Sequence, residues 1–127
     1  MTRILIADPD SPSRKALSLL LTRKLGNINI YEAGDTETLI RTLAEYRLDI
    51  ILLDWRLYGA PAPETCRLIQ KAYPTLKIVL LSVNAEDCQA ALESGAGFIH
   101  KGASPSDLLS VLEPLLNNQG DESLNNN

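Results

Sequence analysis

The chain alternates between short apolar runs and longer stretches in which apolar residues recur every three or four positions. The short runs, rich in β-branched residues, predict five strands, at 3–7, 28–31, 49–53, 77–81 and 97–100. The stretches between them predict helices, as in the spacing of Leu17, Leu20, Leu21 and Leu25. Strands that alternate with helices are typical of βαβ units around a parallel sheet. The third and fourth runs are almost wholly apolar, which favours central strands covered by helices on both faces.

Local signals mark where several of these helices begin and end. Ser11 and Ser104 are each followed by proline, and this pair predicts an N-cap for the first and the last helix. Asp35 is placed to cap the second helix, and Gly26 is placed to end the first. Pro114 lies inside the last helical pattern, so it is predicted to kink or end that helix just before it.

The length of 127 residues is that of one domain with its own core. We expect residues 1–116 to form this domain. The remaining segment, 117–127, reads NNQGDESLNNN and has too few apolar groups to pack. It is therefore predicted to be a polar tail or a linker stub.

Composition narrows the class of protein. Apolar residues make up 45% and charged residues 22% of the chain, as in an ordinary globular domain. The formal net charge is −4 without a run of lysine or arginine, so direct nucleic-acid binding by this domain is not expected. Uncharged stretches fall far short of the ~20 residues that span a bilayer, and Asp8 and Asp10 follow the first apolar run too soon for a signal peptide. We expect a cytoplasmic domain without a membrane partner, in which Cys66 and Cys88 are buried free thiols.

Polar residues follow four of the predicted strands at the point where each strand ends. They are Asp8, Pro9 and Asp10 after the first strand, Asp54 after the third, Ser82 after the fourth and Lys101 after the fifth. In an open parallel sheet, ligands bind beyond the carboxyl ends of the strands, so these side chains should converge. Carboxylates this close raise one another's pKa unless a cation intervenes. Mg2+ and Lys101 would supply that charge, which makes a site for phosphoryl chemistry physically sensible.

The segments DIILLDWRLYG, KIVLLS and GFIHKGASPSDLL resemble the receiver domain of bacterial two-component response regulators. The resemblance runs from about residue 3 to 116 and implies a three-layer, doubly wound α/β fold with a five-stranded parallel sheet, strand order 2-1-3-4-5. The interval from Ser82 to Lys101, 19 residues, is short for the family and predicts a short fourth helix. KGASPSDLL is most similar to receivers that precede a helix-turn-helix DNA-binding domain. Whether an effector domain follows in a longer protein stays open.

The resemblance also implies roles for the residues at the strand ends. Asp54 would be the nucleophile that takes a phosphoryl group from a phosphohistidine. Ser82 and Lys101 would bind phosphoryl oxygens. Asp8, Asp54 and the backbone carbonyl of Arg56 would hold Mg2+.

The signal is expected to leave through a switch made of Ser82 and Phe98, which stands at the family's aromatic switch position. The implied phosphodonor is a sensor histidine kinase or a phosphotransfer protein. The implied output surface is the face of the fourth helix, fifth strand and fifth helix, where a partner or a second copy would dock. The domain would be a signalling module that assists its own phosphorylation and dephosphorylation, not an enzyme acting on another substrate.

Three features depart from the family pattern. Leu57-Tyr58 stands in place of the usual Met-Pro, the switch residue Phe98 cannot hydrogen-bond, and the most serious departure follows the first strand. Receivers have two consecutive acidic residues after the first strand, and here the second is Pro9, which has no side-chain oxygen. Asp10 lies one residue later and would need a changed loop path to act as a metal ligand. The predicted Mg2+ site is therefore weakened, and a second function stays open, a degenerate receiver that binds proteins or dimerises without phosphorylation. A flavodoxin-like enzyme or nucleotide binder ranks below both, because no glycine-rich loop follows the first strand.

Overall fold

The computed structural model describes the chain at residues 1–57 and 59–125, with side chains described up to residue 116. Five parallel strands form one sheet in the order β2-β1-β3-β4-β5, which confirms the predicted topology. The strands are β1 (Thr2–Ala7), β2 (Ile28–Ala33), β3 (Ile50–Asp54), β4 (Lys77–Ser82) and β5 (Gly97–His100). The helices are α1 (Ser11–Leu25), α2 (Thr36–Glu45), α3 (Ala62–Ala72), the 3-10 turn η1 (Ala85–Asp87), α4 (Cys88–Glu93) and α5 (Pro105–Asn125).

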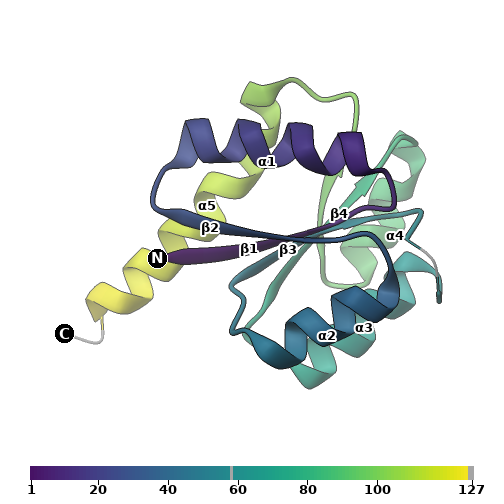
Figure 1. Ribbon diagram of the computed structural model, residues 1–127, viewed down its shortest axis with the longest axis horizontal. Helices are drawn as coiled ribbons and strands as arrows, with labels where there is room; N and C mark the ends of the chain where they lie inside the picture. The colour runs from purple at the N-terminus through teal and green to yellow at the C-terminus, as the bar shows by residue number, and fades with distance from the viewer. Residues whose placement is uncertain (58, 126–127) are drawn as a thin grey trace.

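Helices cover both faces of the sheet, and side chains of alternating direction along each strand divide the core in two (Figure 1). Ile4 and Ile6 of β1 pack with α1 and α5, whereas Leu5 and Ala7 pack on the side of α2, α3 and α4. All four are fully buried. Because successive side chains of a strand point to opposite faces, a strand buried on both sides must be apolar throughout. Every residue of β3 is buried, as the apolar run at 50–53 predicts, and this includes the charged Asp54 at its end.

Most of the predicted caps are present. Asp35 accepts a hydrogen bond from the Thr38 amide at 2.7 Å, and the Asp107 amide donates to the Ser104 hydroxyl at 3.1 Å. Gly26 ends α1 in the left-handed region, at a φ of 57°. These contacts satisfy backbone groups that the helix ends leave without partners.

The predicted N-cap of α1 was wrong by one residue. Asp10 is the cap: its carboxylate accepts from the Ser13 amide at 3.0 Å, and Ser11 is the first residue of the helix. An aspartate caps a helix as well as a serine does, and Pro12 is tolerated in the first turn because its missing N–H has no partner there.

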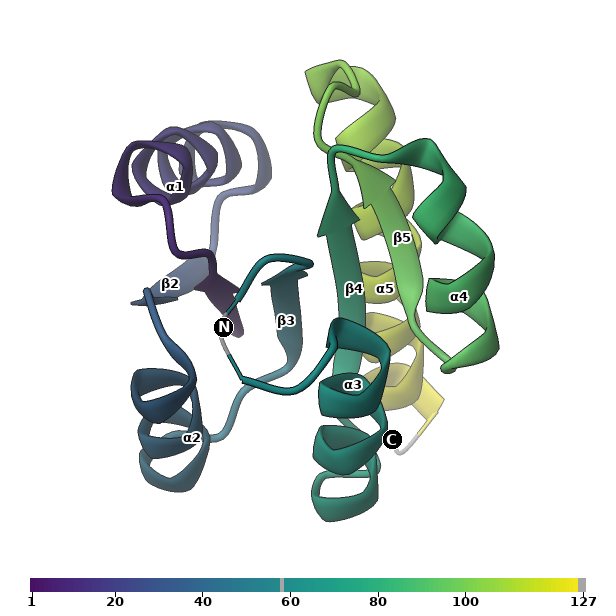
Figure 2. The ribbon, with the colours of Figure 1, turned by 90° about the vertical axis from the view of Figure 1, so that its right-hand side faces the viewer.

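The fourth helix is short, as predicted. The turn η1 leads directly into α4, which has 6 residues and lies beside β5 at the edge of the sheet (Figure 2). Cys88 begins α4 and is half-buried, whereas Cys66 of α3 is fully buried; both are free thiols. Burial raises the pKa of the Cys66 thiol. Within residues 1–57 and 59–125, no helix combines the length and apolar character needed to cross a bilayer.

The prediction that Pro114 ends the last helix was wrong, because α5 continues through it to Asn125. Pro114 cannot donate to the carbonyl of Ser110, one turn earlier, but both residues lie on the exposed side of α5. Water can therefore solvate the freed carbonyl, while Leu108 and Leu112 hold the opposite side of the helix in the core. That 117–127 is a tail or linker stub outside the domain stays a prediction.

We expect Pro114→Ala to stabilise the protein, because alanine restores the missing hydrogen bond and removes the ring clash. The free energy of unfolding should rise by about 1–3 kcal/mol, measured by urea denaturation. Glu113→Ala, at an exposed neighbour in the same helix, is the control and should change it by less than ~0.5 kcal/mol. An unchanged midpoint for Pro114→Ala would mean that α5 contributes no stability beyond this position.

Candidate functional site

Four strands deliver the predicted site residues to one edge of the sheet. The arrowheads of β3, β4 and β5 point to this edge in Figure 2. Asp54 and Ser82 are the last residues of β3 and β4, and Asp8 and Lys101 directly follow β1 and β5. Since all strands are parallel, their carboxyl ends meet here and bring together residues up to 93 positions apart in sequence.

Lys101 joins the two carboxylates of the site. Its ammonium group donates to Asp8 Oδ2 at 2.8 Å and also hydrogen-bonds Asp54 Oδ2. The Asp8 and Asp54 side chains are only 3% and 1% exposed. Burying two carboxylates side by side is costly unless their charge is balanced, so the lysine is required for this arrangement.

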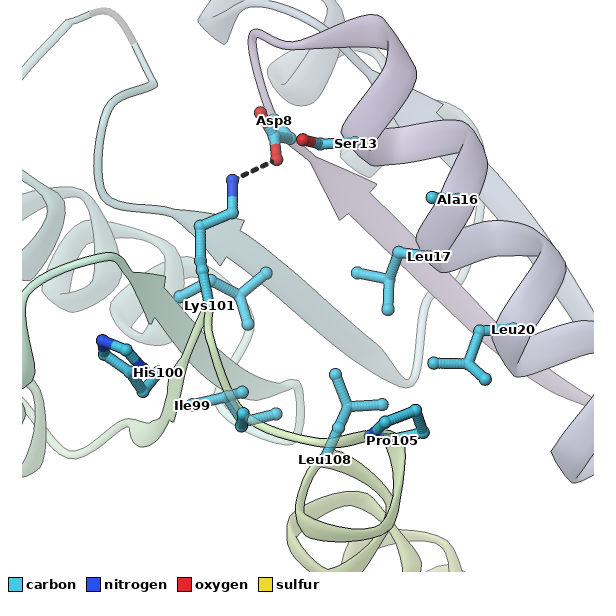
Figure 3. Close-up of a pocket in the computed structure, with 12 residues that line it drawn as sticks. Asp8, Ser13, Ala16, Leu17, Leu20, Ile99, His100, Lys101, Pro105 and Leu108 are labelled. Atoms are coloured by element: carbon cyan, nitrogen blue, oxygen red, sulfur yellow. Dashed lines mark hydrogen bonds and ion pairs between the residues drawn. The ribbon is translucent and has the colours of Figure 1, made fainter.

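The stem of Lys101 passes along an apolar cavity of about 260 Å3 between α1 and α5 (Figure 3). Leu17 and Leu20 of α1 face Ile99 and Leu108 across this space. The hydrocarbon part of the lysine therefore has an apolar surface to lie against, while its charged end reaches the carboxylates.

Arg56 contacts the other side of the same pair of carboxylates. Its amide and its Nε donate to Asp54 Oδ1 at 2.7 and 3.1 Å, and its Nη2 lies 3.6 Å from Asp8 Oδ1. The arginine side chain is 53% exposed. Sequence reasoning proposed the Arg56 carbonyl as a metal ligand and did not predict this side-chain contact, for which the position two residues after Asp54 was the available signal.

These contacts set the charge state of the site. Burial by itself would raise the pKa of Asp54, but hydrogen bonds from Lys101 and Arg56 outweigh it and hold that pKa below the ordinary value of 3.8. Burial would lower the pKa of Lys101, yet its bonds to Asp54 and Asp8 raise it. The hydrogen bond to Asp54 likewise raises the pKa of Arg56. At neutral pH, Asp54 is therefore an anion held between two cations.

The loop between β1 and α1 holds Asp8 in place but directs Asp10 elsewhere. The Asp10 amide donates to Asp8 Oδ1 at 2.8 Å, and Arg14 Nη1 donates to the Asp8 carbonyl at 2.6 Å. The Asp10 carboxylate instead accepts from the Ser13 amide and hydroxyl, and these bonds lower the pKa of Asp10. The structure thus brings Asp8 and Asp54 together without the Asp10 side chain. The part played by Arg14 was not predicted from the sequence.

Ser82 is buried at the same edge, but its hydroxyl points into the loop that follows β4. It donates to Asp87 Oδ2 at 2.5 Å and accepts from the Asn84 amide at 3.0 Å. Sequence reasoning missed Asp87, because nothing in the spacing marks it as the partner of Ser82. The hydroxyl therefore has partners of its own, separate from those of Asp54.

The switch candidate Phe98 and the residue His100 lie on β5. Phe98 is half-buried and packs against the core on the side of α2, α3 and α4. His100 is exposed, and its ring contacts the Val83 carbonyl at 2.9 Å and the Gly102 amide at 3.1 Å. The contact with Val83 connects the end of β5 to the residue that follows β4.

The predicted Mg2+ ligands fit a tight magnesium site poorly. Mg2+ prefers six oxygen ligands and balancing negative charge. Here two carboxylates are available, each of their four oxygens already accepts from or lies against a donor, and Pro9 adds no side-chain oxygen. In the described part of the chain, no group of three or more histidine, cysteine or acidic side chains is placed to hold a metal ion. The site is instead neutralised by Lys101 and Arg56.

The lowered pKa of Asp54 makes stability depend on pH with a defined sign. A carboxyl with a lowered pKa in the folded state contributes stability that is complete above its unfolded value and is lost as the pH falls through the folded one. We expect the unfolding free energy of the wild type, relative to Asp54→Asn, to stay level down to about pH 5 and then to decrease. Urea denaturation at a series of pH values measures this difference. A difference that stays level below that pH would contradict the lowered pKa.

Comparison with known proteins agrees with this geometry. The family model of the response regulator receiver domain matches residues 4–113. The chain is 30% identical to the phosphate regulon transcriptional regulatory protein PhoB of Pseudomonas aeruginosa over 122 residues, covering 92% of this chain and 52% of that protein. It is 28% identical to the transcriptional activator protein ExaE of Pseudomonas putida over 116 residues, covering 89% of this chain and 54% of that protein. It thus spans about half the length of these relatives.

Solved structures share the fold. The isolated receiver domain of RcsB from Salmonella enterica superposes with a TM-score of 0.84 at 22% identity, covering 91% of this chain and 88% of that one. A CheY-like receiver domain protein from Methanospirillum hungatei gives 0.83 at 22% identity, covering 96% and 98%. Because the family match extends over residues 4–113, the chain belongs to the response regulator receiver domains of two-component signalling systems.

Proposed function

We propose that this domain is the phosphoacceptor of a two-component phosphorelay and that Asp54 takes the phosphoryl group. The observation that carries the proposal is the position of Asp54, an ionised carboxylate at the end of β3 held between Lys101 and Arg56. The donor would be a phosphohistidine on a sensor histidine kinase or a phosphotransfer protein. Receiver domains as a family interact with such donors.

Phosphoryl transfer to Asp54 requires mainly that the protein position the reacting groups and balance the negative charge. A carboxylate oxygen of Asp54 forms the bond to phosphorus as the P–N bond of the phosphohistidine breaks, and the imidazole nitrogen keeps the electron pair. Negative charge is then spread over the three remaining phosphoryl oxygens. Lys101 and Arg56 already contact Asp54 and would follow that charge onto the phosphoryl group.

The proposed switch begins with the Ser82 hydroxyl. A phosphoryl group on Asp54 would compete with Asp87 for this donor, and the hydroxyl would have to leave its 2.5 Å contact. Its movement would open space that the half-buried Phe98 can fill by a change of rotamer. Burying that ring is worth on the order of 2 kcal/mol, comparable to coupling energies in switches. The face of α4, β5 and α5 would change as a result and would form the docking surface.

A second candidate is a receiver that works without phosphorylation. It is favoured by the balance of two carboxylates with two cations, which leaves the described site neutral without a metal or a phosphoryl group. Such a module would bind a protein or dimerise through the same face of α4, β5 and α5. Val83 and Leu92, 57% and 58% exposed, offer apolar contacts near it.

Phosphorylation is tested by intact mass after incubation with acetyl phosphate in a magnesium buffer. We expect the wild type to gain one phosphoryl group and Asp54→Asn to gain none, because the nucleophile is removed. Asp10→Asn is the control: its side chain caps α1 and asparagine caps a helix equally well, so the gain should fall only modestly. No gain in the wild type would favour the phosphorylation-independent module, and equal loss in both variants would give Asp10 a role in the site.

The switch is tested by hydrogen exchange with and without beryllofluoride, an acyl-phosphate mimic. We expect the mimic to change exchange on α4, β5 and the first turns of α5, and Phe98→Ala to remove that change without preventing binding at Asp54. Phe98→Tyr keeps a ring of similar size and should keep the response. If the mimic binds at Asp54 and leaves this face unchanged, the domain is a static scaffold.

A further inference from the structure

The carboxylates of Asp8 and Asp54 are held from two sides by cations that use different oxygens. Lys101 bonds the Oδ2 atom of each carboxylate. Arg56 lies against the Oδ1 atom of each, at 3.1 Å from Asp54 and 3.6 Å from Asp8. The two cations and two carboxylates form a closed cluster without net charge.

The two cations differ in how firmly they are held. The Lys101 side chain is 18% exposed and lines the apolar cavity between α1 and α5, whereas the Arg56 side chain is 53% exposed. Ion pairs open to solvent are weak, because water and salt compete for both partners. Arg56 can therefore leave the carboxylates at small cost while Lys101 stays.

We propose that the Arg56 side chain, which lies against the Oδ1 atoms of Asp8 and Asp54, is a built-in counter-cation that competes with a divalent ion for these carboxylates. The usual receiver pattern offers a third carboxylate where this chain has Pro9. Losing that carboxylate and adding the Arg56 guanidinium both shift the local charge in the positive direction. A divalent ion held by Asp8 and Asp54 would then have to compete with the Arg56 guanidinium for their Oδ1 atoms.

The Arg56 side chain would then regulate the metal affinity of the site, and this action does not depend on phosphoryl transfer. Its backbone amide bonds Asp54 at 2.7 Å whatever the side chain is, so a substitution can remove the charge and keep the turn. Methionine matches the length of the arginine stem and carries no charge. The effect of Arg56→Met on Mg2+ binding is therefore chiefly electrostatic.

The experiment is a titration of Mg2+ without a phosphodonor, by calorimetry and by the fluorescence of Trp55, which adjoins Asp54 in the chain. Removing one positive charge next to the ion should tighten the dissociation constant by about tenfold in Arg56→Met. Arg67→Met, on the exposed side of α3, changes the net charge equally and should leave it unchanged. Pro9→Asp should also tighten binding, and the double variant with Arg56→Met should bind more tightly than either.

A dissociation constant that Arg56→Met leaves at the wild-type value, or changes no more than Arg67→Met does, overturns the proposal. So does an absence of binding in all variants. A second measure guards against a folding defect: saturating Mg2+ should raise the Tm of Arg56→Met by more than that of the wild type, because only binding to the folded state stabilises it. Failure of phosphorylation by acetyl phosphate would leave these results unaffected, so the two proposals fail separately.

Discussion

The site depends on one electrostatic constraint: two carboxylates, both almost completely buried, lie close enough to share one ammonium group. Burial opposes the charge on Asp54, and hydrogen bonds from Lys101 and Arg56 outweigh that effect. Lys101 in turn keeps its charge beside the apolar cavity through its bonds to Asp54 and Asp8. Asp8, Asp54 and Lys101 stand at the carboxyl ends of β1, β3 and β5, so their contact also links these strand ends. The charge balance of the site therefore depends on the sheet topology that brings these strand ends together.

Hydrogen bonds to the backbone around the cluster hold its charged side chains in position. Asp8 is held at its amide by the Ala33 carbonyl and at its own carbonyl by Arg14. The Lys101 amide bonds the Ser82 carbonyl at 2.7 Å, and the Trp55 amide bonds the Leu81 carbonyl at 2.8 Å. Each charged residue thus begins its side chain from a strand end that is already hydrogen-bonded to its neighbour. Preorganisation of this kind is what positioning a phosphoryl group requires.

Features that depend on residues close together in the sequence could be predicted from it, whereas features that depend on tertiary contacts could not. The first strand and the cap at Asp35 are local patterns, so composition of the run and residue type predicted them. The strand order came from family resemblance, since spacing does not determine it. The Arg56 contact depends on a side-chain direction that no pattern records. Pro114 was misjudged because its cost depends on which side of α5 faces water, and that is a tertiary property.

The same geometry separates two hydrogen-bond networks that a switch would have to join. Asp54 belongs with Asp8, Lys101 and Arg56, whereas the Ser82 hydroxyl belongs with Asp87 and Asn84. The two networks are connected through backbone bonds and not through side chains. A phosphoryl group on Asp54 would carry oxygens that can accept hydrogen bonds from both Lys101 and Ser82. Coupling would then arise from exchange of partners between existing networks, which needs no large movement of the sheet.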